Sequence, residues 1–237
     1  DWFATPFAGS FIVLAAYALL AMAVQSRVHV PKPAHDERSG SGRPLGEIVR
    51  QPVFVVAVIS AAFGYGIMNL LMVATPLAMD FCSHPFAQAA MVIQWHVVGM
   101  YAPGLFTGSL IKRYGTLKVI LAGVALVGVC IAVALSGTSV AHFLVALALL
   151  GVGWNFMYTG GTTLLTESYA PSEKARAQGA NDFAVFATMG VSSFSSGALV
   201  SVAGWDRMNM LALPVLAIVV VAVVWLARLR RAPAAAS

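Results

Sequence analysis

Long apolar runs separated by short polar connections dominate this chain. Each run extends over roughly 20 residues and is continuously apolar, without the strict alternation that marks a barrel strand. A helix of about 20 residues crosses about 30 Å of hydrocarbon, and its backbone groups are hydrogen-bonded internally, as a bilayer requires. The pattern therefore predicts an all-α membrane protein with seven transmembrane helices. These helices are expected at residues 3–25, 53–79, 87–111, 118–136, 141–166, 182–203 and 209–227.

The basic residues are distributed asymmetrically between the two sides of these helices. Thirteen of the fourteen lysines and arginines follow the first, third, fifth or seventh run, and Arg207 alone lies on the other side. Positively charged loops stay cytoplasmic during membrane insertion. The sequence therefore predicts a multi-pass protein of the cell (inner) membrane whose chain begins outside and whose C-terminus is cytoplasmic.

Composition agrees with this assignment. With 59% hydrophobic and 10% charged residues, 237 residues provide too little polar surface for a water-soluble globule. The formal charge of +5 is explained by loops near anionic lipid heads, so it gives no reason to expect a nucleic-acid partner. Cys82 is expected in an outer connection and Cys130 in mid-membrane, so we predict two free thiols. The five histidines are scattered and no nucleotide motif is present, so we expect no metal and no cofactor.

One connection is much longer than the others. Residues 27–52 are rich in proline, glycine and charge, which is typical of a flexible or partly ordered cytoplasmic linker. The linker divides the chain into one helix at 1–26 and a six-helix bundle at 53–228, followed by a cytoplasmic tail at 229–237. The chain has no initiator methionine and no basic leader before its first span, so we infer a fragment of a longer membrane protein.

Two segments carry a family resemblance. Residues 108–118 read GSLIKRYGTLK and resemble the loop signature of the major facilitator superfamily, which is glycine, x, leucine, x, aspartate, arginine, x, glycine, followed by basic residues. The acidic position is occupied here by Lys112, so a gating ion pair made by that aspartate does not transfer to this chain. Residues 151–179 resemble the tenth helix and following loop of bacterial members.

The resemblance covers the whole chain. Residues 3–25 would be the family's sixth helix and residues 53–227 its seventh to twelfth helices. It implies secondary active transport of a small-molecule substrate by alternating access, with two bundles rocking about a site near the membrane midplane. Efflux and proton coupling are forms that this transport could take. The expected partners are the lipid bilayer and the missing N-terminal helices of the same transporter.

Polar side chains inside the membrane provide the substrate-site candidates. They are costly against lipid, so they are expected to face other helices or a water-filled cavity. Asn69 and Asn155 reach the midplane, whereas Trp154 and Tyr158 could form an aromatic wall. Interhelical packing is the alternative role for these side chains. His96 is either a proton carrier or a neutral histidine bonded to a neighbouring helix. The complete set of candidates is Asn69, Gln94, His96, Trp154, Asn155 and Tyr158.

A second set lies at the cytoplasmic ends of the helices. The two glycines of the loop signature are expected to allow a tight turn and close helix approach. Glu167 is expected to pair with Arg176, Lys174 or Lys112 at an inner gate, or to be a solvated charge. Asp182 is expected in the first turn of the sixth span, where it would cap free amides. The loop and gate candidates are Gly108, Arg113, Gly115, Glu167, Arg176 and Asp182.

The alternative to a transporter fragment is a complete seven-helix receptor or an intramembrane hydrolase. A retinal protein needs a Schiff-base lysine in its last span, and residues 210–227 contain none. A hydrolase could use Ser193, Ser195 or Ser196 with His96, but no nucleophile motif surrounds these serines. We therefore predict a transporter and not an enzyme.

Overall fold

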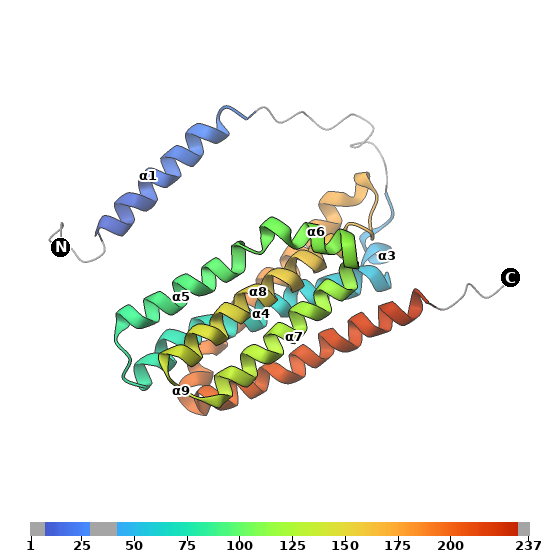
Figure 1. Cartoon of the computed structure of the whole chain (residues 1–237). Coiled ribbons are helices and arrows are strands. Elements are labelled where there is room, and N and C mark those ends of the chain that lie inside the picture. Colours follow the sequence, from blue (N-terminus) through green and yellow to red (C-terminus); the bar gives the residue numbers. More distant parts are fainter. Residues whose placement is uncertain (1–7, 29–41, 232–237) are drawn as a thin grey trace. The chain divides into compact units, whose positions relative to one another are not determined.

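The computed structural model describes residues 8–28 and 42–231, in which all regular structure is helical (Figure 1). The all-α membrane fold is thereby confirmed. Residues 1–7, 29–41 and 232–237 lie outside the described part of the chain. They include the expected start of the first helix, the centre of the linker and most of the tail. The helices are α1 (Ala8–Gln25), α3 (Leu45–Val49), α4 (Pro52–Phe81), α5 (Phe86–Tyr101), α6 (Gly104–Tyr114), α7 (Thr116–Ser136), α8 (Val140–Leu165) and α9 (Lys174–Leu229), with a 3₁₀ turn at Pro171–Glu173.

Residues 1–40 and 41–237 form two separate units. In the first unit, α1 contains 18 residues without a single charge, so it is long and apolar enough to cross a membrane. In the second unit, α8 lies at the centre and packs against α4, α5 and α7, while α4 also packs along α9. The linker is ordered at its end, because α3 packs the fully buried Ile48 into this unit.

Small residues allow α8 to approach its neighbours closely. A Cβ atom on Gly151 would lie 2.5 Å from the carbonyl oxygen of His96 in α5. A Cβ atom on Gly161 would lie 2.9 Å from the carbonyl oxygen of Ala57 in α4. In a bilayer, such close backbone contact supplies the packing that holds helices together. These glycines therefore fix α8 as the axis of the bundle.

The third predicted span is a broken helix and not the continuous one expected at 87–111. α5 ends at Tyr101, α6 begins at Gly104, and the two axes differ by 41°. Pro103 lies between them and has no N–H with which to continue the helical ladder. The polar groups freed by this break need other partners, and α8 supplies them.

The longest helix contains two spans. By length and composition, five helices could cross a membrane, or six if α5 and α6 are counted as one broken span. α9 would be about 84 Å long if straight, far more than one crossing needs. Gly204, with φ of 81°, interrupts it, so that residues 174–203 and 205–229 run back along each other (Figure 1). Counting α9 twice gives the predicted seven crossings, although its first part begins eight residues earlier than expected.

Candidate functional site

Four aromatic side chains from three helices meet beside the centre of α8. Trp154 and Tyr158 stack one turn apart, with ring centroids 5.2 Å apart and planes within 8° of parallel. Tyr65 of α4 meets both edge-on, at 5.4 and 5.6 Å, and Tyr101 at the end of α5 lies 6.3 Å from Trp154. Offset stacking and edge contacts are the favoured aromatic geometries. The structure thus extends the expected aromatic wall by two residues, which we call the aromatic cluster.

The cluster contains a buried donor without an acceptor. Trp154 is only 6% exposed, and its indole Nε1 has no hydrogen-bond partner among the described residues. Tyr65 and Tyr158 are half-buried, whereas Tyr101 is exposed. A buried N–H without a partner costs free energy, unlike an indole that donates to a carbonyl. The cluster therefore combines a flat apolar face with unused hydrogen-bonding capacity.

Asn155 bridges the break between α5 and α6 from its place on α8. Its Nδ2 donates to the carbonyl oxygen of Met100 at 2.8 Å, a group that receives no backbone hydrogen bond across the break within the described residues. Its Oδ1 lies 2.6 Å from Oγ1 of Thr107. That hydroxyl also lies 2.7 Å from the carbonyl oxygen of Pro103, and its single hydrogen can donate to either acceptor. Asn155 is buried, and both polar atoms of its side-chain amide take part in interhelical hydrogen bonds.

His96 lies inside the interface between α5 and α8. It is fully buried, and its Nδ1–H donates to the carbonyl oxygen of Leu147 at 2.8 Å. Its Nε2 has no hydrogen-bond partner among the described residues. The bond to Leu147 ties α5 to α8 and requires a proton on Nδ1, which both the neutral and the protonated ring carry, so the two expected roles of His96 stay predictions.

The remaining two cavity candidates lie apart from the aromatic cluster. Asn69 of α4 is buried, and its Nδ2 lies 2.9 Å from Oγ of Ser192 and 2.7 Å from Oγ of Ser193. This hydrogen bonding ties α4 to α9. Gln94 is exposed on α5. Of the six candidates, only Trp154 and Tyr158 lie in the aromatic cluster, and Asn155 adjoins it.

The glycines of the loop signature have different roles. Gly115 has φ of 91°, a left-handed conformation that favours glycine, and it forms the expected tight turn between α6 and α7. The expectation for Gly108 is wrong, because it lies within α6 and a Cβ atom there would meet nothing within 4 Å. Arg113 places its guanidinium 5.3 Å from the ring centroid of Tyr114. The signature therefore forms a turn through one of its two glycines.

The acidic candidates depart only in part from expectation, because Glu167 is 44% exposed, as expected for a solvated charge, but has a different partner. Glu167 pairs at 2.6 Å with Arg230 at the end of α9, not with Arg176, Lys174 or Lys112. Arg230 was missed because nothing in the sequence brings the end of the last helix next to this loop. The capping role expected for Asp182 is wrong, since α9 begins at Lys174 and Asp182 is exposed two turns inside it. Arg176 is exposed and lies against Gly42 of the linker.

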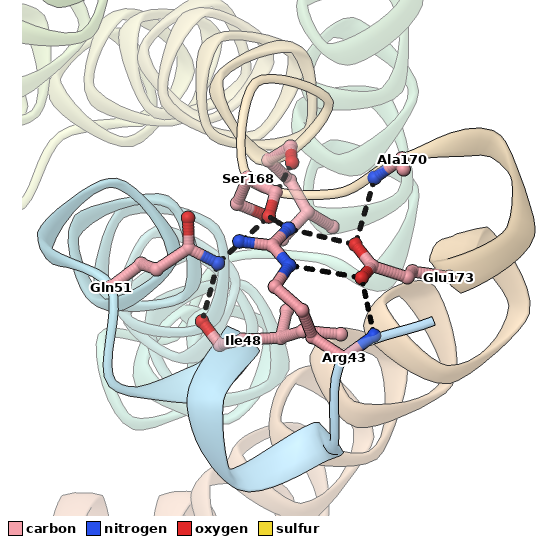
Figure 2. A network of polar contacts seen from close by, with 7 residues as sticks. Arg43, Ile48, Gln51, Ser168, Ala170 and Glu173 are labelled. Carbon is pink, nitrogen blue, oxygen red and sulfur yellow. Dashed lines mark hydrogen bonds and ion pairs between the residues drawn. The ribbon is translucent and has the colours of Figure 1, made fainter. Parts of the chain in front are cut away.

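The most extensive polar network at this end was not anticipated. Figure 2 shows Arg43, from the end of the linker, reaching Glu173 in the connection between α8 and α9. Nε and Nη2 of Arg43 donate to the two carboxylate oxygens at 2.9 and 2.7 Å, and its backbone N–H adds a third bond of 2.7 Å. Ala170 donates its backbone N–H to the same carboxylate at 2.9 Å. We call this arrangement the linker clasp.

The linker clasp extends to the end of α8. Nη2 of Arg43 and Nε2 of Gln51 both donate to the carbonyl oxygen of Ser168, at 3.1 and 2.8 Å. The guanidinium and backbone hydrogen bonds lower the pKa of Glu173 to about 2, and the carboxylate raises the pKa of Arg43. The proline at 171 followed by a glutamate was a usable sequence signal for a helix start. Arg43 carried no signal, because it lay in a linker of disordered composition.

Comparison with known proteins gives one family. The family model of the Major Facilitator Superfamily matches residues 59–237. The riboflavin transporter RfnT of Brucella anthropi is 42% identical over 91% of this chain, which covers 54% of that protein. The uncharacterized MFS-type transporter YdeG of Bacillus subtilis is 30% identical over 92% of this chain, which again covers 54% of it.

A third relative agrees with these two. The uncharacterized MFS-type transporter YddS of Bacillus subtilis is 30% identical over 67% of this chain and 37% of its own length. The chain thus spans about half the length, or less, of these curated relatives. The part of the chain that matches the family begins within α4 and includes α5 to α9, the helices that build the bundle around α8. The chain therefore belongs to the Major Facilitator Superfamily.

Proposed function

We propose that this chain is part of a secondary active transporter that moves a small solute by alternating access. Family membership and three relatives with transporter names support this function over receptor and hydrolase alternatives. In the proposed transporter, N-terminal helices that precede this chain form the other bundle. The site would lie near the midplane, where transporters of this architecture bind their solutes. No enzymatic step is part of the proposal.

The proposed orientation places the linker clasp in the cytoplasm of the cell, at the inner membrane. The clasp and the Glu167–Arg230 pair bring the loops rich in lysine and arginine to one end of the bundle. Arg207 lies at the opposite end, next to the turn at Gly204. Because positively charged loops remain cytoplasmic, this end and the C-terminus are assigned to the inside.

We propose a planar heteroaromatic solute such as riboflavin as the substrate. The aromatic cluster is the observation that carries this proposal, since it offers a flat face at Trp154 and Tyr158 with Tyr65 edge-on beside them. A flavin-like ring would stack on the aromatic side chains, and a polar group attached to that ring could accept a hydrogen bond from the free indole N–H at the edge of Trp154. The 42% identity to a riboflavin transporter agrees with this chemistry.

Uptake of radiolabelled riboflavin by membrane vesicles containing the complete transporter tests the proposal. Trp154→Leu removes both the stacking face and the N–H, so KM should rise at least about tenfold, the loss expected for an aromatic contact worth about 1.5 kcal/mol. Trp225→Leu is the matched control, because Trp225 is 45% exposed on the second part of α9, far from the cluster in the chain. Equal KM values for the two variants, with normal amounts of protein in the vesicles, would refute the proposed site.

A further inference from the structure

A groove of about 340 Å³ opens between the start of α7 and the end of α9. It lies at the end of the bundle that also holds the Glu167–Arg230 pair, and its lining combines charged and apolar residues. The apolar residues Leu121 and Ala227 lie about one turn along their helices from the charged ones. The lining residues used below are Tyr114, Lys118, Leu121, Ala227, Arg230 and Arg231.

A second groove of about 270 Å³ lies on the other side of α7, towards α6 and α8. Leu110, Ala122 and Phe156 contribute to its apolar walls. Tyr114 and Lys118 line both grooves, so one ammonium group and one phenol stand where the two grooves meet. The two grooves therefore adjoin at a cationic residue, and each also has apolar lining.

The positive charge of this head is not neutralised within the described part of the chain. Arg230 is paired with Glu167 at 2.6 Å, so the charges of these two side chains cancel. Neither Lys118 nor Arg231 has a carboxylate partner among the residues that the structure describes. Two unpaired cations thus remain beside a predominantly apolar groove at a membrane boundary. An anion with hydrocarbon chains complements both properties at once.

We propose that these two grooves bind one anionic phospholipid. Lys118 and Arg231 hold its phosphate, Tyr114 contacts its glycerol region, and its acyl chains follow the grooves on either side of α7. The exposed amides at the start of α7 add to the attraction, because Gly115 has no side chain to cap them. The proposal requires only that this end of the bundle lies at a lipid headgroup layer, and it is independent of the transported solute.

Native mass spectrometry of the purified protein, with equal amounts of phosphatidylglycerol and phosphatidylcholine added, tests the site. We expect phosphatidylglycerol to be retained about tenfold over phosphatidylcholine, given the strength of cation attraction at anionic membranes. The double variant Lys118→Gln/Arg231→Gln should reduce this preference to near unity. Arg50→Gln/Lys174→Gln is the matched control, because it removes the same charge from the same end of the bundle outside both grooves.

A second variant separates a lipid site from an anion site. Ala227→Phe keeps every charge but fills the groove between α7 and α9, so it should also lower phosphatidylglycerol retention at unchanged helical content by circular dichroism. Equal loss in both double variants would overturn the proposal in favour of general surface attraction. Full retention in Ala227→Phe, with displacement of the lipid by inorganic phosphate, would overturn it in favour of a free-anion site.

Discussion

The aromatic cluster and the linker clasp treat buried polar groups in opposite ways. In the clasp, Glu173 is only 2% exposed, and both of its carboxylate oxygens accept hydrogen bonds from Arg43 and Ala170. In the cluster, Trp154 is similarly buried, but its N–H has no acceptor among the residues that the structure describes. A satisfied network holds one geometry, whereas an orphan donor lowers stability until a ligand pairs with it. The clasp therefore holds the end of the linker in one position, whereas the cluster can gain free energy when a ligand binds.

The two parts of the broken span next to the cluster differ in how tightly they pack against α8. α5 is held tightly against α8, because Gly99 and Gly151 leave no room for a side chain between the two backbones. In α6, by contrast, Thr107 is the single buried residue, and Leu105 is 91% exposed. The hydrogen bond between Thr107 and Asn155 is therefore the main polar tie of α6 to α8. We infer that this tie sets the angle at Ala102–Gly104 and so the position of Tyr101 within the cluster, 6.3 Å from Trp154.

The largest loss of stability is expected from Asn155→Leu. The substitution leaves the buried carbonyl group of Met100 without a partner and removes the hydrogen bond to Thr107, whose hydroxyl group keeps the carbonyl oxygen of Pro103. The unpaired carbonyl and the lost hydrogen bond together cost about 3 kcal/mol. Reversible unfolding in mixed micelles would measure this loss. In a double-mutant cycle with Thr107→Val, the two effects should fall short of additivity by about 1 kcal/mol. Additive effects would show that Asn155 and Thr107 stabilise the bundle independently.

A smaller loss is expected where α8 meets α5. Gly151→Ala forces a Cβ atom to within 2.5 Å of the carbonyl oxygen of His96, so the helices must separate, at a cost of about 1–3 kcal/mol. Gly108→Ala is the matched control, since a Cβ atom there meets nothing within 4 Å. In the control, the helix gains up to about 1 kcal/mol from the better propensity of alanine. The same unfolding measurement should thus give opposite signs, and equal signs would contradict the close approach.

The features that the sequence predicted share a physical basis. Apolar length and the positions of basic residues are local properties, so the all-α fold and the number of crossings could be predicted without knowledge of any contact. The tight turn at Gly115 was also predictable, because the need for a left-handed residue is local. The break at Pro103 was not predicted, although a proline inside an otherwise continuous apolar run was a local signal for it.

The features that the sequence did not predict depend on which helices become neighbours. Arg43 and Glu173 are 130 residues apart, and Asn155 is 48 residues from Thr107. A polar side chain in an apolar run signals only that it faces away from lipid. It does not reveal whether its partner is a solute or another helix, which is why the cavity and packing roles of Asn69 and Asn155 were both left open. Tyr65 and Tyr101 were missed because a lone tyrosine gives no such signal at all.

The smallest expected effect on stability is the loss of the linker clasp at acid pH. Its hydrogen bonds hold the pKa of Glu173 at about 2, below the ordinary glutamate value of 4.5. A depressed carboxyl pKa contributes stability that is present above pH 4.5 and is lost as the pH falls towards 2. The difference in unfolding midpoint between the wild type and Glu173→Gln should therefore be constant near neutral pH and shrink across this acidic window.

The matched control for the clasp is Glu167→Gln. Its ion pair with Arg230 joins two side chains that are 44% and 39% exposed, and exposed pairs contribute little to stability. The unfolding midpoint should consequently change less in this variant than in Glu173→Gln at neutral pH. A similar change in both variants would mean that the buried, fully hydrogen-bonded carboxylate holds the linker end no more firmly than a surface charge does. The clasp and the aromatic cluster would then differ only in that the N–H of Trp154 has no acceptor within the described residues.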